Sequence, residues 1–213
     1  MKAVQLLVMA KAPLPGKAKT RLIPVLGDVG ASRLALRMLR HSLTQAKGAR
    51  LAGVELCVTD PDDPVWHSPF IPSVGVRSAQ GDGDLGERMS RAAERVLSTG
   101  MSVILMGTDC PDLTSHMLRI AAHCLAQSDA VVIPAADGGY VLLGLRQFDP
   151  RVFSGIAWGG SDVAEKTLAA MRALGWHCTR LPTLHDIDVP QDLSFLPEHW
   201  AEFRGERSSA DTF

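Results

Sequence analysis

Four cationic side chains gather in a short stretch that follows the first apolar segment of the chain. They are Lys11, Lys17, Lys19 and Arg21. Gly16 lies among them, and a phosphate group requires this combination of closely approaching backbone N–H groups and Lys or Arg charges. The stretch is not a P-loop, because Lys11 stands where the first glycine belongs and Ala18 where the hydroxyl belongs. We predict a phosphate site here, and the alternative is a solvated basic loop.

A candidate metal ligand follows a later apolar segment. Asp109 comes directly after the run 102–106, within Gly107-Thr-Asp-Cys-Pro-Asp112. Mg²⁺ is commonly held by one or two carboxylates together with phosphate oxygens of the substrate, which makes Asp109 suitable. The alternative is that Asp109 caps its own turn. Asp112 is ambiguous between this site and a cap of the next helix, and Cys110 acts as a nucleophile only if its pKa is lowered.

Two further aspartates stand near the end of the chain, in His185-Asp-Ile-Asp-Val-Pro-Gln-Asp192. In an extended segment Asp186 and Asp188 project to the same side, because side chains alternate along a strand. We expect one of these two to complete a metal site with Asp109. Asp192 belongs instead to the start of a following helix.

A glycine-containing motif, Gly81-Asp-Gly-Asp-Leu-Gly-Glu-Arg-Met89, precedes a predicted helix. One interpretation is that Gly83 and Asp84 accept a nucleobase or a phosphate at the helix N-terminus. The other is that Asp84 is an ordinary N-terminal cap. The motif alone does not decide between them.

A second glycine motif, Ala135-Ala-Asp-Gly-Gly-Tyr140, lies between two apolar runs. Its glycines suit a simple hairpin corner. Alternatively, Gly138 and Gly139 let the backbone approach a bound sugar or acceptor, and Asp137 binds a hydroxyl group. Both interpretations stay open.

These motifs lie between the regular elements that must position them. Apolar runs predict strands at 4–10, 54–59, 74–79, 102–106, 130–134, 140–145 and 176–181. Amphipathic spacing predicts helices over 31–46, 89–97, about 114–127 and 162–175, and Asp162 with Glu165 resembles a capping box at the last of these.

This alternation of strands and helices predicts an α/β fold with a mostly parallel sheet. The two strands beside Asp137 are too close for a helical crossover, so an antiparallel strand interrupts the sheet there. Ligands of such sheets lie beyond the carboxyl ends of the strands. We therefore expect the motifs to meet at one edge of the sheet.

Composition excludes several other classes of protein. The 213 residues suit one unit over 1–205 with a frayed polar tail over 206–213. A net charge of −1 argues against a nucleic-acid partner, which usually requires a strong basic excess. The four cysteines have no Cys-x-x-Cys spacing, which argues against a disulfide framework or a zinc knuckle. The N-terminal apolar run is too short to cross a membrane. We predict a cytoplasmic protein without membrane insertion, and the oligomeric state is left open.

Taken in order, the motifs resemble the GT-A nucleotide-diphospho-sugar transferase superfamily, which also contains nucleotidyltransferases. The matching stretches are Ala10-Lys-Ala-Pro-Leu-Pro-Gly-Lys-Ala-Lys-Thr-Arg-Leu22, Gly83-Asp-Leu-Gly-Glu-Arg-Met89, Gly107-Thr-Asp-Cys-Pro-Asp-Leu113, Asp137-Gly-Gly-Tyr140 and Asp186-Ile-Asp-Val-Pro-Gln-Asp-Leu193. More closely, they resemble a bacterial glycosyltransferase-like family, the radical-SAM/selenodomain-associated transferases. The basic stretch ending in Lys-Thr-Arg-Leu is also similar to phospholactate guanylyltransferases.

The resemblance implies a Rossmann-like three-layer α/β/α sandwich of GT-A type that holds Mg²⁺ or Mn²⁺ through Asp109 and Asp188, with Asp186 as the neighbouring candidate. It implies transfer of a glycosyl or nucleotidyl group from a nucleotide sugar or nucleoside triphosphate to a small acceptor. The residues expected to bind the nucleotide are Ala10, Lys11, Pro13, Gly16, Lys19, Arg21, Gly83, Asp84, Gly107 and Thr108. Lys19, Arg21 and Asp109 are the expected catalytic residues.

The chain departs from both reaction-specific patterns of the superfamily. The glycosyltransferase D-x-D appears only as the wider Asp109-Cys-Pro-Asp112, and the nucleotidyltransferase G-G-x-x-x-R-M-G loop is replaced by the Lys/Pro-rich version. The sequence therefore favours neither glycosyl transfer nor nucleotidyl transfer over the other. The rival from another class is a non-catalytic nucleotide-binding regulatory module.

Overall fold

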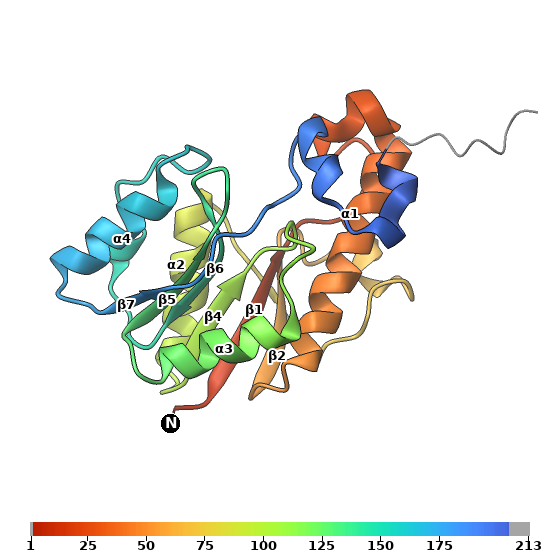
Figure 1. Cartoon of the computed structure of the whole chain (residues 1–213). Coiled ribbons are helices and arrows are strands. Elements are labelled where there is room, and N and C mark those ends of the chain that lie inside the picture. The colour runs from red at the N-terminus through yellow and green to blue at the C-terminus, as the bar shows by residue number, and fades with distance from the viewer. Residues whose placement is uncertain (1, 205–213) are drawn as a thin grey trace, which may run out of the picture.

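The computed structural model describes residues 2–204. Seven strands form one mixed sheet in the order β3-β2-β1-β4-β6-β5-β7 (Figure 1). They are β1 (Val4–Ala10), β2 (Gly53–Val58), β3 (Val76–Ala79), β4 (Ser102–Met106), β5 (Ala130–Pro134), β6 (Tyr140–Leu145) and β7 (Cys178–Arg180). Strand β6 runs antiparallel to β4 and β5, and the other neighbouring pairs are parallel. The predicted fold class, a mostly parallel sheet with one antiparallel interruption, is confirmed.

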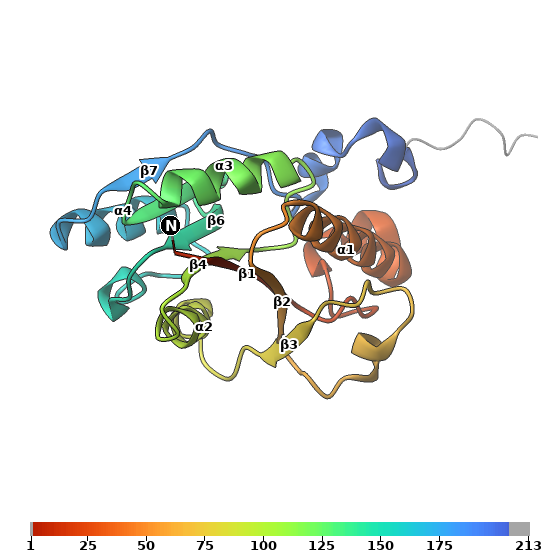
Figure 2. The same ribbon diagram turned by 90° about the horizontal axis from the view of Figure 1, so that it is seen from below.

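Helices cover both faces of this sheet (Figure 2). The α-helices are α1 (Ile23–Gly48), α2 (Leu85–Leu97), α3 (Ser115–Leu125) and α4 (Val163–Ala173). The structure also has short 3₁₀ helices: η1 (Thr20–Leu22), η2 (Pro64–His67), η3 (Pro150–Val152), η4 (Pro190–Phe195) and η5 (Glu198–Phe203). Helices α1 and α3 pack on one face, and α2 and α4 pack on the other.

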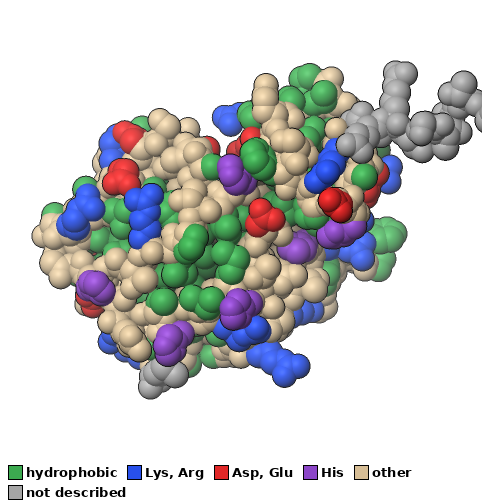
Figure 3. Space-filling model, in the orientation of Figure 1, with side chains coloured by type: hydrophobic (Ala, Val, Ile, Leu, Met, Phe, Trp, Pro, Cys, Tyr) green, Lys and Arg blue, Asp and Glu red, His purple; other side chains and the backbone are tan. Residues whose placement is uncertain are grey.

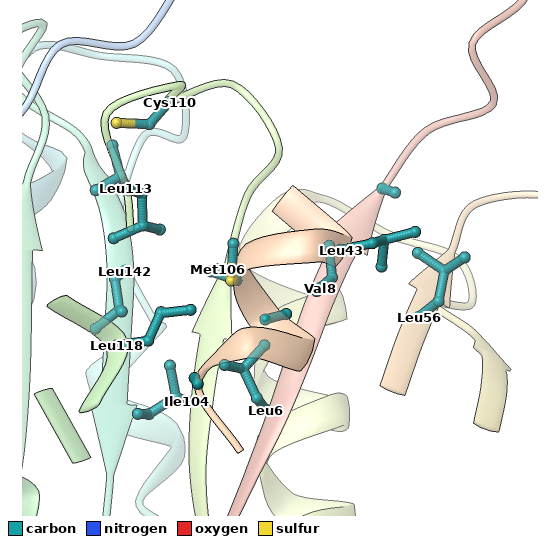
Figure 4. Close-up of a cluster of buried hydrophobic side chains, with 14 of the residues drawn as sticks. Leu6, Val8, Leu43, Leu56, Ile104, Met106, Cys110, Leu113, Leu118 and Leu142 are labelled. Carbon is teal, nitrogen blue, oxygen red and sulfur yellow. The ribbon is translucent and has the colours of Figure 1, made fainter. Parts of the chain in front are cut away.

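The central strands are apolar on both sides because both faces are covered. Leu6 and Val8 of β1 point toward Leu43 of α1 and Leu118 of α3 in one buried cluster (Figure 4). Leu7, between them, packs into the cluster on the α2 face. This explains why the N-terminal run lacks the alternation of a half-exposed strand.

A third buried cluster lies beside the sheet rather than over it. It joins the first half of α1 to η4 and η5, which cross over from β7 to lie against that helix (Figure 1). Leu34 of α1 and Trp200 of η5 are both buried there, and Ile187 packs with them. This cluster holds the 186–188 segment near the loop that follows β1.

Several local predictions can be checked directly. The helix predicted over about 114–127 begins at Ser115 as α3, where the Thr114 side chain accepts a capping hydrogen bond from the backbone N–H of Met117. The prediction of a capping box at the start of α4 is wrong, because the Asp162 side chain makes no capping hydrogen bond. Its carboxylate instead pairs with Lys166 at 2.8 Å, one helical turn later. The predicted tail over 206–213 lies outside the described residues, and no helix within 2–204 is long and apolar enough to span a membrane.

Candidate functional site

A cavity of about 680 Å³ opens at the edge of the sheet where the parallel strands end. Charged side chains of both signs gather near this hollow at the upper side of the molecule (Figure 3). Every motif that the sequence singled out supplies lining residues: Lys11, Lys17, Lys19 and Arg21 after β1; Gly83 and Asp84 after β3; Gly107, Thr108 and Asp109 after β4; Asp137 and Gly139 between β5 and β6; and Asp186 and Asp188 after β7. The structure thus brings the five stretches together.

Three residues expected at the site do not line the cavity. Pro13 is buried, and its carbonyl accepts a hydrogen bond of 2.8 Å from Ser32. Gly16 is exposed, with a left-handed φ of 72° in the turn. Gly138 also has a left-handed φ, and it packs against the beginning of α4. Ala10 does line the cavity, at the end of β1.

The Lys19 ammonium group lies between two carboxylates in this cavity. Its Nζ is 2.6 Å from Oδ1 of Asp109 and 2.8 Å from Oδ1 of Asp188. It also donates a hydrogen bond of 2.6 Å to the carbonyl of Ile187. The Lys19 side chain is only 8% exposed, whereas those of Asp109 and Asp188 are 46% and 41% exposed. The lysine therefore lies beneath two carboxylates that keep access to solvent.

The charges of this group support one another. Burial disfavours the charged form of Lys19, but the carboxylates of Asp109 and Asp188 outweigh it and raise the lysine pKa above its ordinary value. Burial likewise acts to raise the pKa of Asp188, yet the Lys19 ammonium, with Arg21 and Lys11 further away, lowers it overall. Lys19 and Asp188 are therefore both charged near neutral pH.

Asp186 lies in a different environment, although it lines the same cavity. Burial raises its pKa to about 6, and the carboxylates of Asp137, Asp188 and Asp109 add to the shift. Of the two late aspartates, Asp188 is the one that pairs with Lys19.

Backbone contacts hold Asp109 and Asp188 in place. The N–H of Ile187 donates a hydrogen bond of 2.8 Å to the carbonyl of Asp109, which ties the two loops together. Asp192 lies at the start of η4, and its Oδ2 accepts hydrogen bonds of 2.8 Å from the N–H groups of both Asp188 and Val189. The expected role of Asp192 at a helix start is confirmed, although the helix is 3₁₀.

The Asp137 turn packs against the beginning of α4. The Asp137 carboxylate accepts a hydrogen bond of 2.8 Å from the N–H of Gly139. The carbonyl of Gly138 accepts one of 2.9 Å from Ala164, and a Cβ at Gly138 would overlap the backbone of Ser161. The close backbone approach that Gly138 permits is thus to the protein's own chain.

Asp84 is the N-cap of α2. Its carboxylate accepts a hydrogen bond of 2.9 Å from the N–H of Glu87, and the Glu87 side chain accepts one of 2.8 Å from the N–H of Asp84. This is a complete capping box. Asp84 therefore has the structural role that the sequence left open, and it also lines the cavity.

Comparison with known proteins places the chain in a family. Residues 42–160, more than half of the chain, match the family described as "Uncharacterized protein conserved in bacteria (DUF2064)". The chain belongs to DUF2064. No curated protein matches it significantly.

Solved structures resemble this DUF2064 protein over nearly its whole length. A provisionally named nucleotide-diphospho-sugar transferase from Desulfovibrio desulfuricans G20 is 36% identical, with a TM-score of 0.85 over 98% of this chain and 92% of that one. The 4-diphosphocytidyl-2C-methyl-D-erythritol synthase of Anaerococcus prevotii DSM 20548 has a TM-score of 0.61 at 10% identity, covering 94% and 99% of the two chains. The manganese complex of Rv0371c from Mycobacterium tuberculosis H37Rv has a TM-score of 0.52 at 18% identity, covering 95% and 96%. The last two likenesses concern the fold alone.

Several residues that line the cavity of the DUF2064 protein were not predicted from the sequence, among them Arg88 and Trp158. Arg88 stands in the Gly-Glu-Arg-Met stretch quoted for the family resemblance, which was the one signal that could have found it. Trp158 lies in an irregular segment before α4, where no periodic pattern marks it.

The side chains present fit a divalent cation only in part. Within residues 2–204 no group of three or more His, Cys, Asp or Glu side chains is arranged to hold a metal ion. Asp109 and Asp188 nevertheless converge on one cationic atom, Nζ of Lys19. Two carboxylates suit Mg²⁺ or Mn²⁺ when phosphate oxygens and water supply the remaining ligands. The site therefore fits a metal that arrives with a phosphate-bearing ligand.

The Cys110 thiol does not fit a nucleophile. It is buried, and burial raises its pKa to about 12. A thiol is nucleophilic as the thiolate, which is scarce at neutral pH with such a pKa. The chemistry of this cavity thus rests on its cations and carboxylates.

Proposed function

We propose that this DUF2064 protein is a metal-dependent transferase that uses a nucleotide sugar or a nucleoside triphosphate as donor and a small molecule as acceptor. One observation carries the proposal: the Lys19 ammonium lies within 2.8 Å of a carboxylate oxygen of both Asp109 and Asp188, in a cavity that Lys11, Lys17 and Arg21 of the same loop also line. The name of the 36% identical solved structure, a nucleotide-diphospho-sugar transferase, supports it.

In this proposal the donor phosphates lie against the loop that follows β1. Lys11, Lys17 and Arg21 are exposed and line the cavity there, so their charges are available to an anionic ligand. The base and ribose lie toward Ala10 and Gly83. The floor on that side is rigid, because the buried Gln80 amide donates hydrogen bonds of 3.1 Å and 2.9 Å to the carbonyls of Ala10 and Cys57.

Asp109 and Asp188 would hold the Mg²⁺ or Mn²⁺ ion, which when bound stabilises negative charge on the donor phosphates. Lys19 and a divalent cation would compete for the carboxylates of Asp109 and Asp188. Donor phosphates would give the Lys19 ammonium a new partner when those carboxylates hold the metal. We therefore infer that metal and nucleotide bind together more strongly than either binds alone.

Little covalent chemistry is required of the protein in this reaction. Positive charges placed where negative charge develops, in a site that holds few waters, typically contribute several kcal/mol. Alignment of acceptor and donor supplies most of the rest. Lys19, Arg21 and Asp109 are the residues to which we assign these roles, and no nucleophile is assigned.

The reaction has two candidate forms. Three or four cations in one loop suit a triphosphate slightly better than a diphosphate sugar. The name of the 36% identical protein favours the sugar. The same proposal includes four further points. The chain is one of the radical-SAM-associated transferases and is similar to phospholactate guanylyltransferases. It forms a single unit over 1–205 and is located in the cytoplasm.

A thermal-shift panel separates these forms. Nucleoside triphosphates and nucleotide sugars are each added with and without Mg²⁺ or Mn²⁺. A ligand at a hundred times its Kd stabilises the native state by about 2.7 kcal/mol, which is readily seen. A metal-dependent shift with a triphosphate supports nucleotidyl transfer, and one with a nucleotide sugar supports glycosyl transfer. The absence of any nucleotide shift would contradict the proposed function.

A further inference from the structure

One end of the cavity lies away from the basic loop, between α2 and the segment before α4. Its wall is apolar: Met89 and Leu105 belong to the cluster on the α2 face, and Trp158 packs against that cluster. The basic loop, by contrast, leads into η1 and α1, which pack on the other side of the molecule. The cavity therefore has two chemically different ends.

Trp158 is held in position at this end. Its ring meets Tyr140 edge-on, with centroids 6.4 Å apart and planes at 89°. The indole also lies directly over Gly86 of α2, where a Cβ would overlap it. The half-buried tryptophan thus presents a fixed flat surface to the cavity.

Arg88 is the cation at this end, and its charge has no partner within the described chain. It is half-buried and lines the cavity. Its Nε is inaccessible to solvent and makes no hydrogen bond within residues 2–204, and no carboxylate there lies within 4.0 Å of its guanidinium. The guanidinium charge is therefore not compensated by a carboxylate, and an anionic ligand in the cavity would stabilise it.

We propose that this end of the cavity is the acceptor subsite, and that the acceptor carries a carboxylate or a phosphate group bound by Arg88 and an apolar part that lies against Trp158. The inference rests on the proposed function. A guanidinium binds either anion through two parallel hydrogen bonds, which suits Arg better than Lys at such a position. The basic loop already supplies the cations that a donor requires. Arg88 therefore accommodates the acceptor's charge at this end of the cavity.

Phenyl phosphate, benzoate and benzyl alcohol are matched probes, because they share a ring and differ in charge. Isothermal titration to the full chain should show binding of at least one of the two anions and none of the neutral alcohol. Arg88→Met should weaken anion binding about tenfold or more. Arg33→Met, at an exposed position on α1 away from the cavity, is the matched control and should leave it unchanged.

Gly86→Ala tests the apolar half without touching Arg88. The added methyl group must displace Trp158, so anion binding should fall and the change in tryptophan emission on binding should disappear. Equal anion binding by the wild type and by Arg88→Met, equal binding of benzyl alcohol, or no binding of either anion at about 10 mM would overturn the acceptor subsite.

Nucleotide shifts measured on the same variants separate the two proposals. If the proposed function and the subsite are both right, Arg88→Met keeps the metal-dependent nucleotide shift while it loses the anion. If Arg88→Met loses the nucleotide shift as well, Arg88 belongs to the donor site and the acceptor subsite is wrong, while the proposed function stands. If the wild type shows no nucleotide shift, the proposed function itself fails.

Discussion

The ammonium nitrogen of Lys19 lies 2.6 Å from Oδ1 of Asp109, although the two residues stand on loops that follow different strands. Asp188 shares the same ammonium at 2.8 Å. The buried ammonium keeps the two carboxylates close enough together to share one small cation. This arrangement makes Lys19 a competitor of any metal that binds Asp109 and Asp188.

Lys19→Met should increase the affinity for Mn²⁺ in the absence of nucleotide, because the competing ammonium is removed from Asp109 and Asp188. We expect a gain of several-fold in Mn²⁺ affinity, measured by electron paramagnetic resonance of the free ion. Turnover should fall about 10²- to 10³-fold, as when one preorganised group at a developing charge is removed. Lys17→Met, in the same loop but exposed, should not raise Mn²⁺ affinity. Unchanged or weaker Mn²⁺ binding by Lys19→Met would show that Lys19 does not compete with the metal.

Asp192→Ala should weaken metal-dependent nucleotide binding, although Asp192 itself does not contact the ligand. The substitution removes the acceptor of two backbone N–H groups, at Asp188 and Val189, and so releases Asp188 from its position. We expect about tenfold weaker binding, equivalent to about 1.4 kcal/mol, by titration calorimetry. Asp149→Ala removes a similar backbone acceptor at η3 and is the control, with stability affected but binding retained. Equal binding losses in the two variants would mean that Asp192 acts only through stability.

Gly138→Ala should destabilise the fold strongly. The residue has a φ of 94°, and its added methyl group would overlap the backbone of Ser161, which cannot move aside as a side chain can. We expect a loss of about 3 kcal/mol or more in the free energy of unfolding, measured by urea denaturation. Gly155→Ala, with a φ of 71° and open space around it, isolates the backbone strain alone and should cost about 1 to 2 kcal/mol. Equal losses would contradict the packing of the turn on α4.

Cys110→Ala should leave nucleotide binding and turnover nearly unchanged, although Cys110 directly follows Asp109 in the chain. Burial raises the pKa of the thiol to about 12, so the thiol is neutral over the whole range from about pH 6 to 9. Iodoacetamide should accordingly modify Cys110 slowly in the native protein, as followed by mass spectrometry. Rapid modification at about pH 8 together with loss of nucleotide binding would indicate a reactive thiol instead.

Much of the fold could be predicted because the signals were local. The runs that form β1, β4, β5 and β6 are short and apolar, as strands covered on both faces must be, and their predicted bounds agree closely with the structure. The antiparallel position of β6 followed from the shortness of its connection to β5. Since ligand sites of such sheets lie at the carboxyl edge, the meeting of the five motifs at one place could be predicted as well.

The features that could not be predicted depend on contacts between distant residues. Nothing local distinguishes Asp188 from Asp186, since the choice depends on Lys19 reaching across from another loop. Gly138 was open between two roles because its neighbour, Ser161, is supplied by the segment before α4. Asp162 looked like half of a capping box, yet Lys166, one turn later, takes its carboxylate. Arg88 and Trp158 carry no periodic signal, and only packing places them at the cavity.

Metal-dependent nucleotide binding is tested most directly by calorimetric titration of nucleotides, in the presence and absence of Mn²⁺, into the wild type, Asp109→Asn and Asp112→Asn. Asp112 is exposed in the same loop and does not line the cavity, so it is the matched control. We expect at least one nucleotide to bind the wild type and Asp112→Asn tightly only with Mn²⁺. Asp109→Asn should lose this dependence on Mn²⁺ and at least about tenfold in nucleotide affinity. Nucleotide binding that is indifferent to Mn²⁺ and to Asp109→Asn, or no nucleotide binding at all, would contradict the proposed function.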